Sequence, residues 1–321
     1  MKTHRKNKVV IAGGSGFMGE SFIRHFGDRF DEVVVLTRGN EKIEGKVKFV
    51  HWDGKTPTEW TSELNGADLL LNLCGRSVDC RYNEKNKKEI LDSRIDSTTA
   101  LGTAVIMASN PPKLWVNAAS ATIYRHAEDR PMTEAEGEIG NDFSVGVCKS
   151  WEKTFWDIPV PETRKVLLRT ALVLGERGGV FERLTQLSRF GLGGAQGSGK
   201  QMMSWIHERD FCEIVMFMLQ NDHLEGTFNA AAPVPVDNRD FMHQLRKSLQ
   251  VPFGLPATNW MVEIGTFLMR TESELILKSR WVLPEKLQEA GYQFHFRDLK
   301  SAFEQLTDSK RVSGKPAVSG L

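Results

Sequence analysis

A run of closely spaced glycines near the start of the chain has the composition of a phosphate-binding loop. The segment Gly-Gly-Ser-Gly-Phe-Met-Gly at 13–19 follows the apolar residues 9–12 and precedes a stretch with helical periodicity. One glycine permits a tight turn, one lets the backbone approach a pyrophosphate, and one allows the helix to pack closely on the strand. Amides at the start of the helix would face the phosphates. The predicted dinucleotide-binding residues are Gly13, Ser15, Gly16, Phe17, Met18 and Gly19; the alternative is an ordinary turn between a strand and a helix.

The end of the second predicted strand carries the residues that distinguish NAD from NADP. In folds of this kind a carboxylate at that position hydrogen-bonds the ribose hydroxyls of NAD, whereas an arginine can pair with the 2′-phosphate of NADP. Thr37 and Arg38 occupy the position here, and Asp31 and Glu32 lie at the opposite end of the strand. We therefore expect NADP(H) as the cofactor; the alternative is that Arg38 is a solvated turn residue.

The elements that would position these loops alternate along the first half of the chain. Short, continuously apolar segments predict buried strands, and segments with helical periodicity predict the helices between them. Strands are expected at 9–12, 33–36, 47–50, 67–73, 114–118 and 166–169, and helices at 17–26, 84–107 and 208–220. This alternation is typical of a doubly wound α/β domain, the NAD(P)-binding Rossmann fold, whose parallel sheet is covered on both faces.

The composition changes after about residue 175, where a second, smaller region begins. A glycine-rich loop covers 191–200, and residues 238–303 are mostly helical and interrupted by prolines. The expected domains are an NADP-binding Rossmann domain at 1–175 with a later segment at about 205–232 returning to it, a mostly helical substrate and C-terminal region at 176–204 and 233–308, and a frayed tail at 309–321.

The overall composition excludes several classes of protein. Of the 321 residues, 40% are hydrophobic, which is enough for a sizeable core. Lysine and arginine number 42 against 41 aspartates and glutamates, a balance that argues against nucleic acid as the main partner. No apolar run is long enough for a membrane span or a signal peptide. Four cysteines without a Cys-x-x-Cys pair favour a cytoplasmic location, and the histidines lack metal-ligand spacing, so no metal is expected.

A series of short motifs resembles the extended short-chain dehydrogenase/reductase superfamily over nearly the whole chain. The resemblance is closest to its atypical epimerase branch, described as nucleoside-diphosphate-sugar epimerases with a small uncharacterised C-terminal domain. The motifs are Gly13 to Gly19, Asn72-Leu73-Cys74-Gly75, Ser93-Arg94, Trp151-Glu152, Leu168-Arg169-Thr170, Gly178-Gly179, Ser204-Trp205-Ile206-His207 with Asp210, and Leu283 to Leu287.

The resemblance implies further residues around the cofactor. Leu73, Cys74 and Gly75, which leave the fourth predicted strand, would lie along the adenine–ribose side of the cofactor. Asp53, after the third strand, would reach the adenine. Glu89 and Arg94 would point towards the cofactor from the long helix; the alternative for Arg94 is an ordinary surface residue.

The resemblance also implies a catalytic serine. Members of the superfamily use a serine or threonine after the fifth strand together with a Tyr-x-x-x-Lys pair, whose lysine lowers the pKa of the tyrosine. The segment 117–124 resembles the Ser-Ala-x-x-Tyr segment of the family and makes Ser120 the candidate, with a loop-capping serine as the alternative. Tyr124, at the end of the same segment, could supply a second hydroxyl.

The Tyr-x-x-x-Lys pair itself is missing. Counting back from Glu152, the tyrosine position holds Ser144 and the lysine position holds Cys148. None of the three tyrosines of the chain is followed four residues later by a lysine. Cys148 could act as a weak acid, but a small apolar residue in the core is the simpler interpretation.

The glycine-rich loop and the segment after it are the candidate substrate side. In extended relatives the corresponding stretch closes over the nucleotide half of a sugar nucleotide. Amides near Gly197 could meet a diphosphate and Lys200 could add charge, with a flexible hairpin as the alternative. Trp205 and His207 complete the candidates, although a histidine in such a place is more often a structural hydrogen-bonder.

Two functions of different class remain open from the sequence. One is an NADP-dependent oxidoreductase or epimerase that acts on a nucleotide-linked sugar or another small carbonyl or hydroxyl substrate, as a monomer or homodimer. The other is an NADP(H)-binding regulatory or redox-sensing protein that has lost its catalytic pair.

Overall fold

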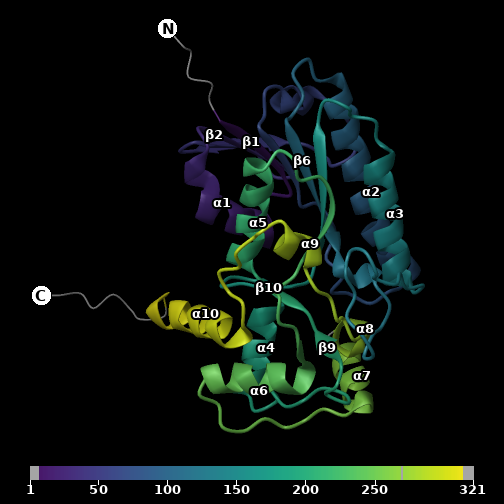
Figure 1. Ribbon diagram of the computed structural model, residues 1–321, viewed down its shortest axis with the longest axis vertical. Helices are drawn as coiled ribbons and strands as arrows, with labels where there is room; N and C mark the ends of the chain where they lie inside the picture. Colours follow the sequence, from purple (N-terminus) through teal and green to yellow (C-terminus); the bar gives the residue numbers. More distant parts are fainter. Residues whose placement is uncertain (1–6, 269, 314–321) are drawn as a thin grey trace, which may run out of the picture.

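A parallel sheet forms the centre of the molecule (Figure 1). The computed structural model describes residues 7–268 and 270–313. The sheet has eight strands in the order β11-β7-β6-β5-β1-β2-β4-β3, and only β3 runs antiparallel to its neighbour. The strands are β1 (Lys8–Ala12), β2 (Glu32–Thr37), β3 (Lys42–Glu44), β4 (Val47–His51), β5 (Leu69–Asn72), β6 (Leu114–Ser120), β7 (Arg164–Thr170) and β11 (Gly226–Ala230). The predicted doubly wound Rossmann fold is confirmed.

Helices cover both faces of this sheet. They are α1 (Phe17–Phe26) and α5 (Glu208–Gln220) on one face and α2 (Glu84–Met107) and α3 (Phe143–Asp157) on the other (Figure 1). Val9 and Ile11 enter the apolar layer beneath α1 and α5, whereas Val10 and Ala12 enter the layer beneath α2 and α3. Because successive strand side chains point to opposite faces, a strand buried on both sides must be apolar throughout. This explains why continuous apolar runs identified the strands.

The strand order reverses between β2 and β5, the two neighbours of β1. The chain winds from β1 to β2 and β4 in one direction, then returns to β5, β6, β7 and β11 in the other. In open parallel sheets, ligands bind outside the carboxyl ends of the strands at such a reversal. The glycine loop that follows β1 therefore lies at the expected binding edge.

The C-terminal region packs around a second apolar core below the sheet edge (Figure 1). The helices that surround this core are α4 (Gly179–Arg189), α6 (Asn238–Ser248) and α10 (Leu299–Ser313). The region also holds α7 (Asn259–Leu268), α8 (Glu274–Leu277) and α9 (Glu285–Glu289), and Leu287 of α9 packs in the core of the large sheet. Two small sheets join the region: β8 (Leu172–Leu174) with β10 (Trp205–His207), and β9 (Met202–Met203) with β12 (Val236–Asp237). The tail expected to be frayed is helical from 309 to 313, and its remainder lies outside the described residues.

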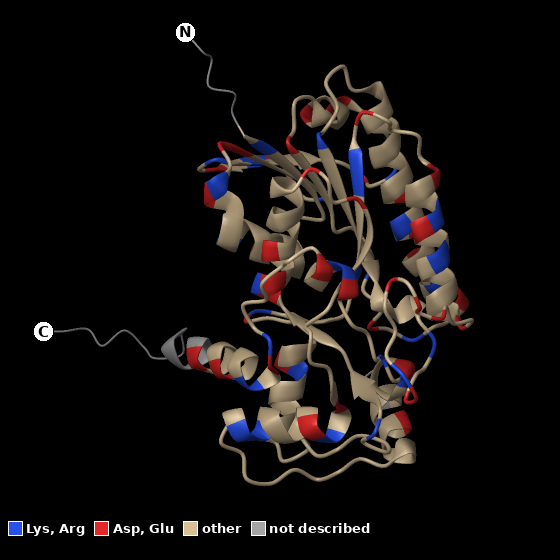
Figure 2. Cartoon of the chain, viewed as in Figure 1, with Lys and Arg blue, Asp and Glu red and all other residues tan. Residues whose placement is uncertain are grey.

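Charged residues of both signs are interspersed over the outer helices. Blue and red residues are mixed over α2 and α3 (Figure 2), and on α2 Lys87 and Lys88 pair with Glu84 and Asp92. Within the described ranges, no helix is long and apolar enough to cross a membrane.

Helix α1 approaches the loop before it more closely than a side chain would allow. A Cβ atom at Gly19 would lie 2.3 Å from the Cα atom of Gly14. Real Cβ atoms do not approach another carbon this closely, so only glycine lets the first turn of α1 lie against the loop. Gly19 is thus the glycine of the motif that serves packing.

We predict that Gly19→Ala destabilises the fold although alanine is the better helix former. The gain in helix propensity is about 1 kcal/mol, whereas overpacking costs about 1–3 kcal/mol. The free energy of unfolding, measured in urea, should fall. The matched control is Gly146→Ala in α3, where a Cβ atom would have no heavy atom within 4 Å. It should raise the free energy of unfolding by about 0.5–1 kcal/mol, and an equal effect of the two substitutions would contradict the assignment.

Candidate functional site

A cavity of about 770 Å³ opens at the carboxyl ends of β1, β2 and β5. Ten of the fourteen residues that the sequence suggested for the cofactor line it: Gly13, Ser15, Gly16, Thr37, Arg38, Asp53, Leu73, Cys74, Gly75 and Glu89. These residues come from loops after four strands and from helix α2. The tertiary fold thus brings them to one place.

Gly13 and Gly16 of the loop have different tasks. Gly13 has φ +78°, and a Cβ atom there would lie 3.0 Å from the carbonyl of Leu73. At Gly16, a Cβ atom would have only the carbonyl oxygen of Gly13 within 4 Å, at 3.3 Å. Gly13 therefore forms the tight turn against β5, and Gly16 leaves its backbone open towards the cavity, as a pyrophosphate site requires.

Arg38 is the exposed cation at the tip of β2. It forms no ion pair with any residue in the described ranges, whereas the other two cations of the cavity are paired. Lys55 contacts Asp96 at 2.8 Å, and Arg76 pairs with Glu89. Arg38 is therefore the cation available for a ligand phosphate, and sequence reasoning missed both Lys55 and Arg76.

Two of the lining carboxylates are occupied within the protein. Asp53 accepts hydrogen bonds from the backbone amides of Lys55 and Thr56, both at 2.7 Å, and from the Thr56 hydroxyl. These bonds lower the pKa of Asp53 to about 2. Glu89 is held by Arg76. Both residues border the cavity, and both carboxylates are bound to other residues of the protein, which holds the cavity wall in place.

Four suggested cofactor residues lie outside the cavity lining. Phe17 packs against the glycines at 175–179, and Met18 packs against the apolar core. Arg94 donates hydrogen bonds to the carbonyls of Arg76, at 3.1 Å, and Ile90, at 2.8 Å. The expectation that Arg94 points to the cofactor is therefore corrected: it supports the loop that forms the cavity wall. Gly19, as described above, serves packing.

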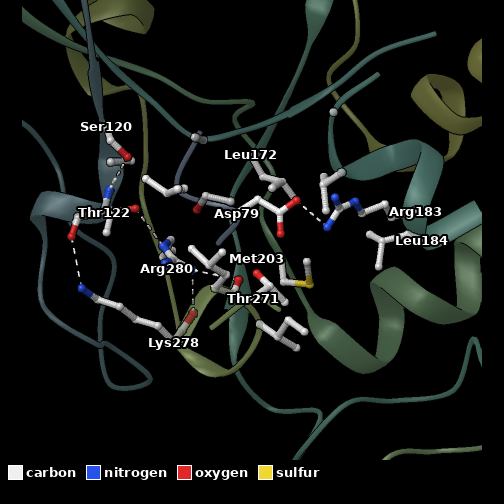
Figure 3. Close-up of a pocket in the computed structure, with 18 of the residues that line it drawn as sticks. Asp79, Ser120, Thr122, Leu172, Arg183, Leu184, Met203, Thr271, Lys278 and Arg280 are labelled. Atoms are coloured by element: carbon white, nitrogen blue, oxygen red, sulfur yellow. Dashed lines mark hydrogen bonds and ion pairs between the residues drawn. The ribbon is translucent and has the colours of Figure 1, made fainter. Parts of the chain in front are cut away.

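A second cavity of about 720 Å³ lies between the ends of β6 and β7 and the C-terminal region (Figure 3). Ser77 lines both cavities, so the two adjoin. Ser120 lines the second cavity, and its Oγ accepts a hydrogen bond from the amide of Thr122 at 3.2 Å. Its hydroxyl hydrogen donates to no residue within the described ranges.

Two cations from the C-terminal region enter this second cavity. Lys278 donates from Nζ to the Thr122 carbonyl at 3.2 Å and to Asp142 at 2.7 Å. Arg280 donates from Nε to the Thr122 hydroxyl at 3.1 Å (Figure 3). Sequence reasoning missed both, since they lie more than 150 residues after Ser120 and belong to no motif.

Tyr124 does not face either cavity. Its buried hydroxyl donates to Asn229 at 2.9 Å and accepts from Arg169 Nη1 at 2.9 Å. Burial raises the pKa of Tyr124 against the opposing effect of Arg169. The expectation of a catalytic Tyr124 is therefore corrected, because the hydroxyl is already paired in the core.

The four suggested substrate residues lie outside the second cavity. Gly197 bonds the Ala257 carbonyl at 2.7 Å through its amide, and Lys200 is exposed elsewhere. The indole of buried Trp205 donates to a backbone carbonyl at 3.1 Å. His207 caps α5 by accepting from the amide of Arg209, and burial lowers its pKa to about 4. The residues of this segment that do line the cavity are Gln196, Met202, Met203 and Ser204.

The residues at the positions of the missing Tyr-x-x-x-Lys pair are buried inside the protein. Ser144 donates to Glu274 at 3.1 Å. Cys148 is buried, and burial raises its pKa to about 12, which keeps it a neutral thiol. Neither residue lines either of the two cavities, so neither restores the relay there.

We predict that Tyr124→Phe lowers stability and leaves cofactor affinity unchanged. The substitution strips Arg169 and Asn229 of a buried partner, which costs about 1–3 kcal/mol. Urea unfolding measures the loss, and an NADPH titration followed by fluorescence gives the affinity. Unchanged stability would show that the hydroxyl is not part of a structural network.

Comparisons with known proteins agree with this architecture. Residues 9–145 match the NAD dependent epimerase/dehydratase family, and residues 257–306 match a domain of unknown function (DUF1731). Epimerase family protein SH2119 of Staphylococcus haemolyticus is 30% identical over 309 residues, which cover 94% of this chain and 99% of that protein. Epimerase family protein SDR39U1 of Bos taurus is 30% identical over 305 residues, covering 93% and 99%.

A solved structure resembles the whole fold. Human epimerase family protein SDR39U1 (isoform 2), crystallised with NADPH, matches with a TM-score of 0.84 at 29% identity and covers 94% of this chain and 99% of that one. The resemblance inferred from the sequence motifs is confirmed. By this likeness over nearly its full length, the chain belongs to the epimerase family that these relatives represent.

Proposed function

We propose that the protein is a cytoplasmic NADP(H)-dependent oxidoreductase of the epimerase type, acting as a monomer or homodimer on a small carbonyl or hydroxyl substrate. The observation that carries the proposal is the pair of adjoining cavities. One has the glycine loop and Arg38, the other has Ser120, and Ser77 borders both. A cofactor in the first cavity and a substrate in the second would meet at their junction.

The lining of the first cavity supports NADP(H). Gly16 leaves room for a pyrophosphate, and Arg38 has no acidic partner within the described ranges. An unpaired arginine beside the ribose position favours a 2′-phosphate over a free hydroxyl. That human SDR39U1 was crystallised with NADPH agrees with this choice.

Ser120 is the residue we assign to the reacting oxygen of the substrate. Its Oγ is fixed by the Thr122 amide, which leaves its hydrogen free to donate into the cavity. NADPH, when bound, supplies a hydride, and the serine would orient the carbonyl that receives it. A nucleotide-linked sugar is one substrate class compatible with the family; the cavity is equally open to other small carbonyl compounds.

A regulatory protein is the second candidate, and one observation favours it. Ser144, Cys148 and Tyr124 are all held in the core, so the usual proton relay has no replacement among these residues. Redox sensing through a thiolate is disfavoured at Cys74, Cys148 and Cys212, because burial raises the pKa of each to about 12. Turnover of a substrate separates the two candidates.

We predict that NADPH binds more tightly than NADH and that Arg38→Asp removes or reverses this preference. A charge-assisted hydrogen bond contributes about 1.5–3 kcal/mol, or roughly 10- to 100-fold in affinity. Fluorescence titration with both cofactors measures the ratio. Lys247→Asp, an equal charge change on the exposed face of α6, is the control and should leave the ratio unchanged. Equal affinities of the unaltered protein for the two cofactors would refute the assignment.

We also predict that Ser120→Ala lowers turnover by about 10²-fold or more, the low end for losing a positioned proton-transfer group. The assay follows NADPH absorbance with a panel of sugar nucleotides and small carbonyl compounds. NADPH affinity should change by no more than a few-fold, because Ser120 lies in the second cavity.

Cys148→Ala is the control for this assay and should have a much smaller effect. Loss of turnover in Cys148→Ala with activity retained in Ser120→Ala would make the thiol the reacting group. If no compound in the panel is turned over, the regulatory function is the better one.

A further inference from the structure

The three cations that line the second cavity differ in whether a carboxylate forms an ion pair with them. Arg183 pairs with Asp79 (Figure 3). Lys278 pairs with Asp142 at 2.7 Å. Arg280 forms no ion pair with any residue that the structure describes. The carboxylates of Glu274 and Asp142 act on Arg280 only through space, and they contact Ser144 and Lys278 instead. A guanidinium that no carboxylate contacts, largely withdrawn from water, is costly for the protein and is a common mark of an anion-binding site.

Some N–H donors of the Arg280 guanidinium have no hydrogen-bond acceptor among the described residues. Nε donates to the Thr122 hydroxyl at 3.1 Å, and Nη1 reaches the carbonyls of Leu275 and Lys278 only at 3.4 Å. Nη2 donates to no residue in the described ranges. Arg280 lines the cavity, and Figure 3 shows its side chain between Thr122 and Thr271. The guanidinium can thus present donors to a ligand while Thr122 holds it in place.

Thr271 provides a second, independent observation. The residue is buried and lines the cavity, and its Oγ1 has no hydrogen-bond partner. Buried hydroxyls are paired in most proteins, so an orphaned one beside a cavity points to a ligand that completes it. Its hydrogen can be donated to the same anion that Arg280 would attract.

The rest of the cavity wall is largely apolar. Its larger apolar side chains include Leu172, Leu184, Leu187, Met203, Leu275 and Ile276, while Glu182, Gln186 and Gln196 are among its polar residues. A space of about 720 Å³ with this wall suits a small organic molecule with an apolar body and one charged end. A diphosphate with a polar sugar would leave these side chains facing polar groups.

We propose that the second cavity takes a largely apolar substrate with one carboxylate, which binds Arg280 and Thr271. This inference rests on the proposed function and names the substrate class of the same site. Thr122, two residues after Ser120, positions Arg280 through its hydroxyl. The carboxylate would therefore anchor the substrate close to the serine that orients its reacting oxygen. A carboxylate is chosen over a phosphate because it carries one negative charge, which one guanidinium balances, whereas a phosphate carries about −1.5 to −2 and the other two cations of the cavity are already paired with acids.

Two probes of equal shape test the proposal by isothermal titration calorimetry on the full chain. They are 4-phenylbutyrate and its neutral counterpart 4-phenylbutanamide, each titrated with and without saturating NADPH. We expect the carboxylate to bind about 10- to 100-fold more tightly than the amide. Arg280→Gln should abolish this preference. The matched comparison is Arg183→Gln in the same cavity, which should keep the preference because Asp79 already neutralises Arg183.

Each result decides for or against the proposal. No preference for the carboxylate in the unaltered protein, or an equal loss in Arg183→Gln and Arg280→Gln, overturns it. Tighter binding of 3-phenylpropyl phosphate than of 4-phenylbutyrate overturns the choice of a carboxylate. If Arg280→Gln does not fold by circular dichroism, Arg280→Lys decides: lysine cannot form the bidentate pair, so the preference should fall several-fold, and an unchanged preference overturns the proposal.

The affinity for NADPH is measured in the same samples. A variant that loses the carboxylate preference but binds NADPH normally has lost only the substrate site. An unaltered protein that shows the preference but does not bind NADPH would contradict the proposed oxidoreductase and leave the carboxylate site standing.

Discussion

A buried ion pair at the carboxyl end of β7 joins the two halves of the molecule. Arg169 donates two hydrogen bonds to Glu152 of α3, at 2.9 and 2.8 Å, and a third to the hydroxyl of Tyr124. The Tyr124 hydroxyl in turn donates to the side chain of Asn229 in β11. The side-chain Nδ2 of Asn229 donates to the carbonyl of Leu283 in the C-terminal region. Removing one member of such a pair leaves an uncompensated buried charge, at a cost of about 3–5 kcal/mol. The network therefore fixes the edge at which both cavities open.

Hydrogen bonds within the protein also occupy residues at or near the positions where the family's catalytic groups were expected. The position of the missing phenol is taken by Ser144, which bonds Glu274 of the C-terminal region, and Tyr124 is held by Arg169. The positive charges near Ser120 come instead from Lys278 and Arg280, which the C-terminal region inserts from outside the sheet. The chemistry at this site therefore depends on contacts between the two regions rather than on one helix.

Much of the Rossmann half could be predicted because its strands are buried on both faces and its loops follow local rules. The strand 9–12, the helix 17–26 and the helix 84–107 all form where the apolar pattern indicated. Short strands such as β9, with two residues, carry too little periodicity to be recognised. Gly13 and Arg38 line the first cavity, and their place at this edge could be predicted because a turn after a strand is a property of the local sequence.

The sequence by itself determined the glycine loop, the lack of a carboxylate after β2, and the lack of a Tyr-x-x-x-Lys pair, since each depends on residue types at fixed short spacing. Only the tertiary structure decided which hydroxyls and cations face a cavity. Tyr124 turns into the core because Arg169 and Asn229 bind its hydroxyl there, and His207 becomes a helix cap. Arg280 reaches Thr122 across 158 residues because two folded regions pack together, which no local pattern records.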